Sequence, residues 1–201
     1  MRKLIVGSLT ALLFCATWVG QASATPTESS ADTVRVLIVY HTMTGNTRTL
    51  AEAVAEGARR VAGAEVTLKP VDEAVNDDLE ACDALLIGSP TYWGSISTPV
   101  KKFIDDRRVF MGDKVGGAFA TGGSDGGGKE LAVLSILAAM LNNGMIVAGP
   151  HYEEGGFQFG GFGVGATTGS DSPGLDEAEL SRGRLLGERV ATVAKRYRGS
   201  R

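Results

Sequence analysis

The sequence is poor in the residues that form disulfides and bind transition metals. Its 201 residues include two cysteines, Cys15 and Cys82, and two histidines, His41 and His151. Such a set predicts neither a disulfide framework nor a cysteine-based metal site, and two histidines do not predict a histidine-rich centre. We therefore expect no metal ion, and a fold that depends on the packing of its core.

An excess of basic residues is also missing. Lysine and arginine total 20 against 23 aspartate and glutamate residues, which gives a formal net charge of −3. Without Arg2 and Lys3 the chain would be more acidic still. This balance argues against nucleic acid or an anionic membrane surface as a partner, because both attract positive charge.

The longest apolar run is confined to the start of the chain. Two basic residues precede residues 4–19, which are mostly apolar, and small residues of the A-x-A kind end at Ala24. This is the pattern of a secretory signal peptide, and the run is too short and wrongly flanked for a membrane anchor. We predict cleavage after Ala24 and a periplasmic or secreted protein, with 25–32 a flexible lead-in and 33–201 one domain.

Apolar segments of strand and helix type alternate through that domain. Residues 34–40 form a nearly continuous apolar run rich in β-branched residues, as expected for a parallel strand that is buried on both faces. Further strands are predicted at 65–71, 84–88, 115–120 and 144–148, and helices at 48–62, 99–106, 129–142 and 176–198. The alternation predicts an α/β fold, a doubly wound five-stranded parallel sheet with helices on both faces. Ligands of such sheets bind at the carboxyl ends of the strands, near the point where strand order reverses.

The segment after the first strand is rich in hydrogen-bond donors. Three threonine hydroxyls and the amides around a glycine gather at the start of a predicted helix, where free N–H groups favour a bound phosphate. The alternative is that one of these side chains only caps the helix. We predict a phosphate loop made of Thr42, Met43, Thr44, Gly45, Asn46 and Thr47.

Two adjacent aromatic residues follow the third strand between proline and glycine. Such residues are poor core material there but suit a surface on which a flat conjugated ring stacks. The alternative is that Trp93 packs under a loop without a ligand. The predicted ring-contacting residues are Pro90, Thr91, Tyr92, Trp93 and Gly94.

A glycine-rich segment follows the fourth strand and lets backbone amides approach a ligand closely. Two other motifs fit the same residues. Gly123 to Lys129 matches G-x-x-x-x-G-K, but Glu130 replaces the hydroxyl that would hold Mg²⁺. Gly122 to Gly126 matches the G-x-S-x-G nucleophile elbow with Ser124, for which His151 is the available base. The predicted ligand-binding residues of this segment are Thr121, Gly122, Gly123, Ser124, Gly126 and Gly127.

These three segments resemble flavin-binding proteins. The pattern Thr-x-Thr-Gly-Asn-Thr at 42–47 looks like the FMN phosphate loop of flavodoxins. Residues 90–94, and Gly-Gly-Lys-Glu at 127–130, are similar to the flavin-contacting segments of WrbA-type NAD(P)H:quinone oxidoreductases. The resemblance covers residues 34–198 and implies a flavodoxin-like domain, FMN as cofactor, NAD(P)H as electron donor and a quinone as acceptor.

The chain departs from the WrbA-type pattern at several places. Its first loop is of the flavodoxin kind, and Asn142 stands where that family has a flavin-contacting histidine. The insertion after the second strand is absent, so the family's tetramer is not predicted. Residues 107–113 are a shortened form of a tryptophan-containing segment. The resemblance and position suggest Trp93, His151 and Tyr152 as substrate-binding residues.

The leading hypothesis is an FMN-dependent oxidoreductase that passes electrons to a quinone or another flat acceptor. No catalytic side chain is then needed, because the chemistry resides in the flavin. A flavodoxin-type electron carrier with a redox protein partner is the alternative, and a binding module without turnover is a third. A secreted serine esterase that uses Ser124 is the remote one.

Overall fold

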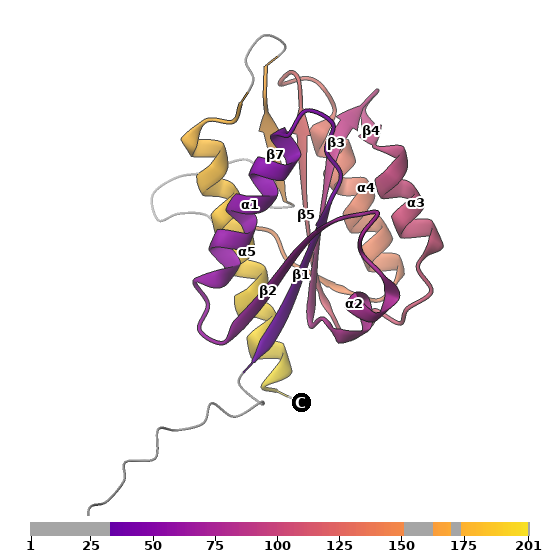
Figure 1. Ribbon diagram of the computed structural model, residues 1–201, viewed down its shortest axis with the longest axis vertical. Coiled ribbons are helices and arrows are strands. Elements are labelled where there is room, and N and C mark those ends of the chain that lie inside the picture. Colours follow the sequence, from indigo (N-terminus) through magenta and orange to yellow (C-terminus); the bar gives the residue numbers. More distant parts are fainter. Residues whose placement is uncertain (1–32, 151–162, 170–173, 201) are drawn as a thin grey trace, which may run out of the picture.

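The computed structural model describes residues 33–150, 163–169 and 174–200, and its strands form one sheet (Figure 1). The strand order is β2-β1-β3-β5-β6, with β4 paired to β3 and β7 paired to β5. All pairings are parallel except the short β3–β4 hairpin. The elements in chain order are β1 (Val34–Tyr40), α1 (Asn46–Arg59), β2 (Ala64–Pro70), α2 (Asn76–Ala81), β3 (Ala84–Tyr92), β4 (Ser95–Ile96), α3 (Thr98–Asp106), β5 (Val115–Gly122), α4 (Lys129–Asn142), β6 (Ile146–Val147), β7 (Val164–Thr167) and α5 (Glu177–Arg198).

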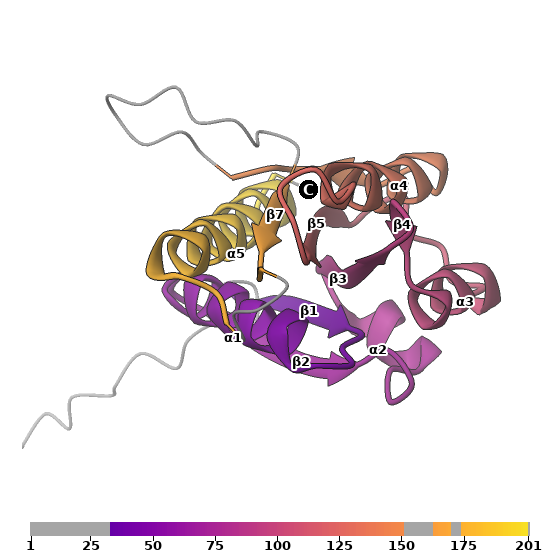
Figure 2. The same cartoon turned by 90° about the horizontal axis from the view of Figure 1, so that it is seen from above.

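Helices cover both faces of the sheet (Figure 2). α1 and α5 pack on one face, where Leu50 and Leu186 are fully buried against Ile38 and other strand residues. α2, α3 and α4 pack on the opposite face, where Ile136 and Val39 belong to a second core. The strands that lie between the two cores are therefore apolar on both sides, as the sequence predicts for β1.

The predicted doubly wound α/β fold is confirmed. Strand order reverses between β1 and β3, since the chain passes from β1 outward to β2 and then returns to β3 on the other side. The carboxyl ends of β1, β3 and β5 lie at the same edge, the upper one in Figure 1. This edge is where a ligand of such a sheet binds.

The fifth strand differs from its prediction. The predicted strand 144–148 contains only the two-residue β6, which pairs with Val115 and Gly116 at the start of β5. The far half of the same edge is filled by β7, which pairs with β5 from Phe119 to Gly122. One edge position is thus shared by two short strands.

Some of the sequence-based predictions lie outside the described residues. These are the signal peptide and lead-in, residues 1–32, and two of the suggested substrate-binding residues, His151 and Tyr152. Within the described part of the chain, no helix is both long and apolar enough to span a membrane.

Candidate cofactor site

The loop between β1 and α1 leaves the first turn of the helix open. The N-cap residue is Gly45, which has a φ of 94°, and no side chain caps the helix. Thr42 Oγ1 instead accepts a hydrogen bond from the Gly45 N–H at 3.0 Å, and Thr44 Oγ1 accepts one from Nδ2 of the Asn46 side chain at 3.3 Å. Met43 is 74% exposed at the tip. Side-chain capping therefore does not account for the cluster of donors, and the N–H groups of the first turn face outward for an anion.

A buried pair of hydroxyls joins this loop to the end of β5. Thr47 Oγ1 and Thr121 Oγ1 lie 2.8 Å apart, and both side chains are buried. Only one hydrogen is used between the two hydroxyls, so the other O–H can donate to a ligand. The predicted residues Thr47 and Thr121, 74 positions apart, thus meet at one point.

The predicted loop after the third strand is the end of a longer strand. β3 continues to Tyr92 and turns into β4 through Trp93 and Gly94, which have φ angles of 53° and 73°. Positive φ at both central residues is the type I′ geometry that favours Asn-Gly, and tryptophan is strained there. Trp93 is fully exposed, so the alternative in which it packs under a loop is wrong. Backbone strain of this kind is typical of functional sites.

The glycine-rich segment between β5 and α4 lies against this hairpin. A Cβ on Gly128, whose φ is 81°, would be 2.6 Å from Gly94 Cα, so the two backbones are in contact. Gly123 and Gly126 face open space, since a Cβ there would meet nothing within 4 Å. The structure therefore brings the three predicted segments, 42–47, 90–94 and 121–127, to one edge of the sheet.

A polar network that the sequence analysis did not predict supports the hairpin. The Ser97 N–H donates to Ser89 Oγ at 2.9 Å, and Ser97 Oγ lies 3.0 Å from Nδ1 of His41. Ser89 and Ser97 are fully buried. Burial lowers the pKa of His41, against a smaller opposing effect of Asp72, so a neutral imidazole is favoured. Serine is too common for its position in a sequence to reveal such contacts.

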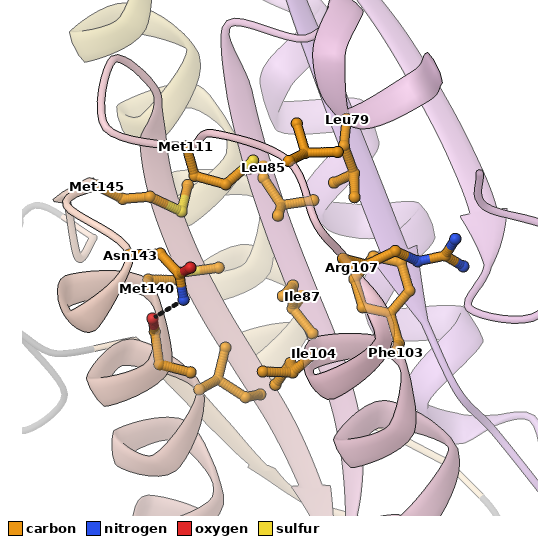
Figure 3. A pocket seen from close by; sticks show the side chains of 13 residues that line it. Leu79, Leu85, Ile87, Phe103, Ile104, Arg107, Met111, Met140, Asn143 and Met145 are labelled. Carbon is orange, nitrogen blue, oxygen red and sulfur yellow. Dashed lines mark hydrogen bonds between the residues drawn. The ribbon is translucent and has the colours of Figure 1, made fainter. Parts of the chain in front are cut away.

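A small cavity lies away from these loops, between α3, α4 and the sheet (Figure 3). Its volume is about 50 Å³, far below the few hundred Å³ of a typical cofactor pocket. Met111, Met140 and Met145 contribute to an apolar lining, and Arg107 stacks on Phe103 with 4.9 Å between guanidinium carbon and ring centre. The cavity contains none of the predicted site residues, so the cofactor site is identified from the strand-end loops.

The esterase alternative is not supported by the geometry. A nucleophile elbow places the serine directly between strand and helix. Here β5 ends at Gly122 and α4 begins at Lys129, so Ser124 lies in an exposed loop that contains a turn and is separated from the helix. In the described ranges no three or more His, Cys, Asp or Glu side chains form a possible metal site.

Comparisons with known proteins agree with this architecture. Residues 37–130 match the model of the flavodoxin domain family. A flavodoxin of Aquifex aeolicus is 46% identical over 57% of this chain and 64% of its own length. An NAD(P)H dehydrogenase (quinone) of Archaeoglobus fulgidus is 34% identical over 81% of this chain and 98% of its own length.

The solved structures include one with a similar fold throughout. The flavodoxin, WrbA-like protein from Agrobacterium tumefaciens has a TM-score of 0.64 and 28% identity, over 82% of this chain and 99% of that one. With its fold, its strand-end loops and relatives matched over nearly their full length, the chain belongs to the NAD(P)H dehydrogenase (quinone) family of flavodoxin-like enzymes.

Proposed function

We propose that this protein binds FMN at the ends of β1, β3 and β5 and passes electrons through it from NAD(P)H to a quinone or a similar flat acceptor. The observation that carries the proposal is the convergence of the three segments 42–47, 90–94 and 121–127 at the reversal of strand order. The names of the relatives, NAD(P)H dehydrogenase (quinone), support the same donor and acceptor.

The residues present fit the phosphate of FMN. The first turn of α1 lacks a side-chain cap, and the Thr47–Thr121 pair retains one free O–H. The hydroxyls of Thr42 and Thr44 lie beside the same turn; their oxygens accept hydrogen bonds from the protein, so their O–H groups can donate to the phosphate. A phosphate dianion there would accept hydrogen bonds from the N–H groups of this turn and be attracted by the positive end of the helix dipole.

The hairpin fits a flat ring. Trp93 and Tyr92 are exposed next to the glycine-rich loop, and Thr91 Oγ1 is buried without a hydrogen-bond partner among the described residues. An orphaned hydroxyl of this kind is uncommon unless a ligand or water completes it. When bound, FMN supplies the electron-transfer chemistry, so the side chains need only bind and orient it and leave one ring face open.

An electron carrier is the second candidate. Two observations favour it: the flavodoxin form of segment 42–47, and the 46% identity to a flavodoxin over 122 residues. A carrier would use the exposed Trp93 and Met43 at the flavin edge to meet a redox protein. Turnover with a small acceptor distinguishes the two.

We also propose that the chain is exported; in that case an electron source at the membrane takes the place of NAD(P)H as the donor. The motivation is the signal-peptide pattern of residues 1–24, since NAD(P)H should be scarce outside the cytoplasm. Expression with and without residues 1–24, followed by cell fractionation and N-terminal sequencing, tests export. A mature protein that begins at Thr25 outside the cytoplasm is expected, and an uncleaved cytoplasmic chain would contradict it.

The central experiment first measures FMN binding and then enzymatic turnover. Residues 25–201 are purified without flavin and titrated with FMN by fluorescence quenching. Phe110→Ala is the control, because that exposed aromatic lies between α3 and the amino end of β5, at the opposite edge of the sheet from the three loops. Tight binding, weakened in Trp93→Ala and unchanged in the control, is expected. Steady-state assays with NADH or NADPH and a benzoquinone then test for an oxidoreductase. Protein that does not take up FMN would refute the proposal, and loaded protein without turnover would favour the carrier.

A further inference from the structure

Lys129 is a buried cation directly below the glycine-rich loop. It is the first residue of α4, and its side chain is only 7% exposed. Lysine is rarely buried unless its ammonium group has partners, because the loss of hydration is costly. Neither the phosphate-loop motif nor the nucleophile motif explains this burial.

The side chain lies in a slot that two glycines leave open. A Cβ on Gly122, in β5, would be 3.5 Å from Lys129 Cβ, and a Cβ on Gly165, in β7, would be 3.1 Å from Lys129 Cγ. The lysine stem therefore passes closely between β5 and β7. This fit fixes where its ammonium group lies.

The ammonium group contacts the loop from below. Nζ donates to the carbonyl oxygen of Asp125 at 3.2 Å and, more weakly, to that of Ser124 at 3.5 Å. The carboxylates of Asp125 and Glu130 are each 3.7 Å from it, and both residues are exposed. Ion pairs with exposed carboxylates are largely screened by water, so the carbonyl contacts define its role.

Where a carbonyl group of the loop points toward Lys129, the N–H group of the following residue points away from it. In a planar trans peptide the C=O and the following N–H point in opposite directions. Lys129 holds the Asp125 carbonyl, and it shares the Ser124 carbonyl with the Gly127 N–H, which donates to that oxygen at 3.1 Å. The N–H groups of Gly126 and Asp125 therefore face away from the ammonium group. No described residue accepts a hydrogen bond from either N–H. Both groups are thus available to a ligand at the open side of the loop.

We propose that Lys129 is a positioning residue for the flavin. It holds the loop 122–128 with the amides of Asp125 and Gly126 turned to the cofactor, and its buried positive charge favours uptake of electrons at the site. The inference rests on the proposed FMN binding. It assigns to Lys129 two separable effects, one on the loop and one on the charge.

A second contact of the loop provides a matched control. Thr167 Oγ1, in β7, donates to Asp125 Oδ1 at 2.7 Å. This bond and then the charge of Lys129 lower the pKa of the Asp125 carboxyl. Thr167→Val removes this tie of the loop but leaves the charge of Lys129 in place. It should therefore weaken FMN binding without moving the midpoint potential.

The test compares Lys129→Met, Lys129→Gln and Thr167→Val in the FMN-loaded protein. Midpoint potentials are measured by spectroelectrochemistry, and dissociation constants of oxidised FMN by titration. Lys129→Met, which loses donor and charge, should raise the dissociation constant at least tenfold; Lys129→Gln, which keeps a donor, should raise it less. Both should weaken binding of reduced FMN about tenfold more than that of oxidised FMN, which lowers the two-electron potential by about 30 mV.

Each result decides one part. Wild-type affinity and potential in Lys129→Met would overturn the inference, and so would an equal shift of potential in Thr167→Val, because that variant keeps the charge. Circular dichroism and thermal unfolding of each apoprotein identify a variant that fails to fold; Lys129→Gln then decides alone. If wild-type protein does not bind FMN, the proposed function fails instead.

Discussion

At the scale of single residues, the burial of Cys82 makes the stability of the fold depend on the ionisation of its thiol. Its thiol is 5% exposed and donates to the Leu79 carbonyl at 3.3 Å. Burial raises its pKa to about 11, and the nearby Lys114 opposes this only in part. Unfolded chain ionises near the ordinary value of 9.0, so between these limits the unfolded state binds fewer protons than the folded state. The free energy of unfolding must therefore fall as pH rises from 9 to 11.

The expected loss from Cys82 is about 2 to 3 kcal/mol across that range. Urea unfolding at pH 8, 9, 10 and 11 measures it, with Cys82→Ala as the comparison. The variant begins less stable because a small cavity is left, but its stability should decline less steeply. Parallel curves for both proteins would show that the thiol does not cause the decline.

Trp93 is the residue where stability and ligand binding conflict. Its φ of 53° is unfavourable for a bulky side chain, whereas asparagine tolerates it in a type I′ turn. Trp93→Asn should stabilise the apoprotein by about 1 kcal/mol and weaken FMN binding by up to about tenfold through lost stacking. Chemical unfolding of apoprotein and FMN titration check the two effects. Unchanged FMN affinity would contradict the stacking role, and a loss of apoprotein stability would contradict the strain at Trp93.

At the scale of elements, α1 and α5 pack with their backbones in contact. A Cβ on Gly57 would be 1.8 Å from the Arg184 carbonyl oxygen, and one on Gly187 would be 1.9 Å from that of Val54. Only glycine permits this approach. The two helices cover one face of the sheet, and α1 carries the open helix terminus of the candidate site.

Gly187→Ala separates helix propensity from packing. Propensity alone would favour alanine by about 1 kcal/mol in a helix interior. The clash with a backbone atom cannot be relieved by a rotamer change, so we expect a net destabilisation of about 3 kcal/mol. Thermal and urea unfolding measure it. Gly174→Ala, which lies before α5, is the control for a glycine-to-alanine change without a clash, since a Cβ there meets nothing within 4 Å. A stabilised Gly187→Ala protein would mean that the helices move apart without cost.

The elements differ in how far their sequences predict them. β1 and α4 have the predicted bounds because a nearly continuous apolar run and a long apolar helix are local signals. α2 is six residues long, β4 is two, and β7 contains a glycine, so none has a strong local pattern. β7 exists through its pairing with β5, more than forty residues away. Long-range pairing of this kind overrides local propensity.

The site follows the same rule. Segments 42–47, 90–94 and 121–127 were recognisable because polar, aromatic or glycine-rich residues follow apolar strands. The contacts that join them were not recognisable, because the Thr47–Thr121 pair and the burial of Lys129 depend on strands that are distant in sequence. Sequence thus predicts which loops bind, while the fold decides which side chains hold them in place.

At the scale of the whole molecule, the fold and the cofactor are linked by mass action. If the chain is exported unfolded, as proposed, FMN binding follows folding and acts on the folded state alone. FMN that binds only the folded state should raise the free energy of unfolding by about 2.7 kcal/mol at a hundredfold excess over its dissociation constant. For a chain of this size the melting temperature should then rise by about 5 to 10 °C.

Riboflavin separates the phosphate loop from the ring site in that experiment. It has the same ring but no phosphate, so it leaves the first turn of α1 and the Thr47–Thr121 hydroxyls without a ligand. Differential scanning calorimetry of apoprotein at increasing FMN or riboflavin concentration should therefore show a smaller shift with riboflavin at every concentration. Equal shifts would contradict the proposal that residues 42–47 bind the phosphate, but would be compatible with a ring bound at the hairpin. No shift with either ligand would argue against a flavin site as a whole, because mass action requires one for any ligand that prefers the folded state.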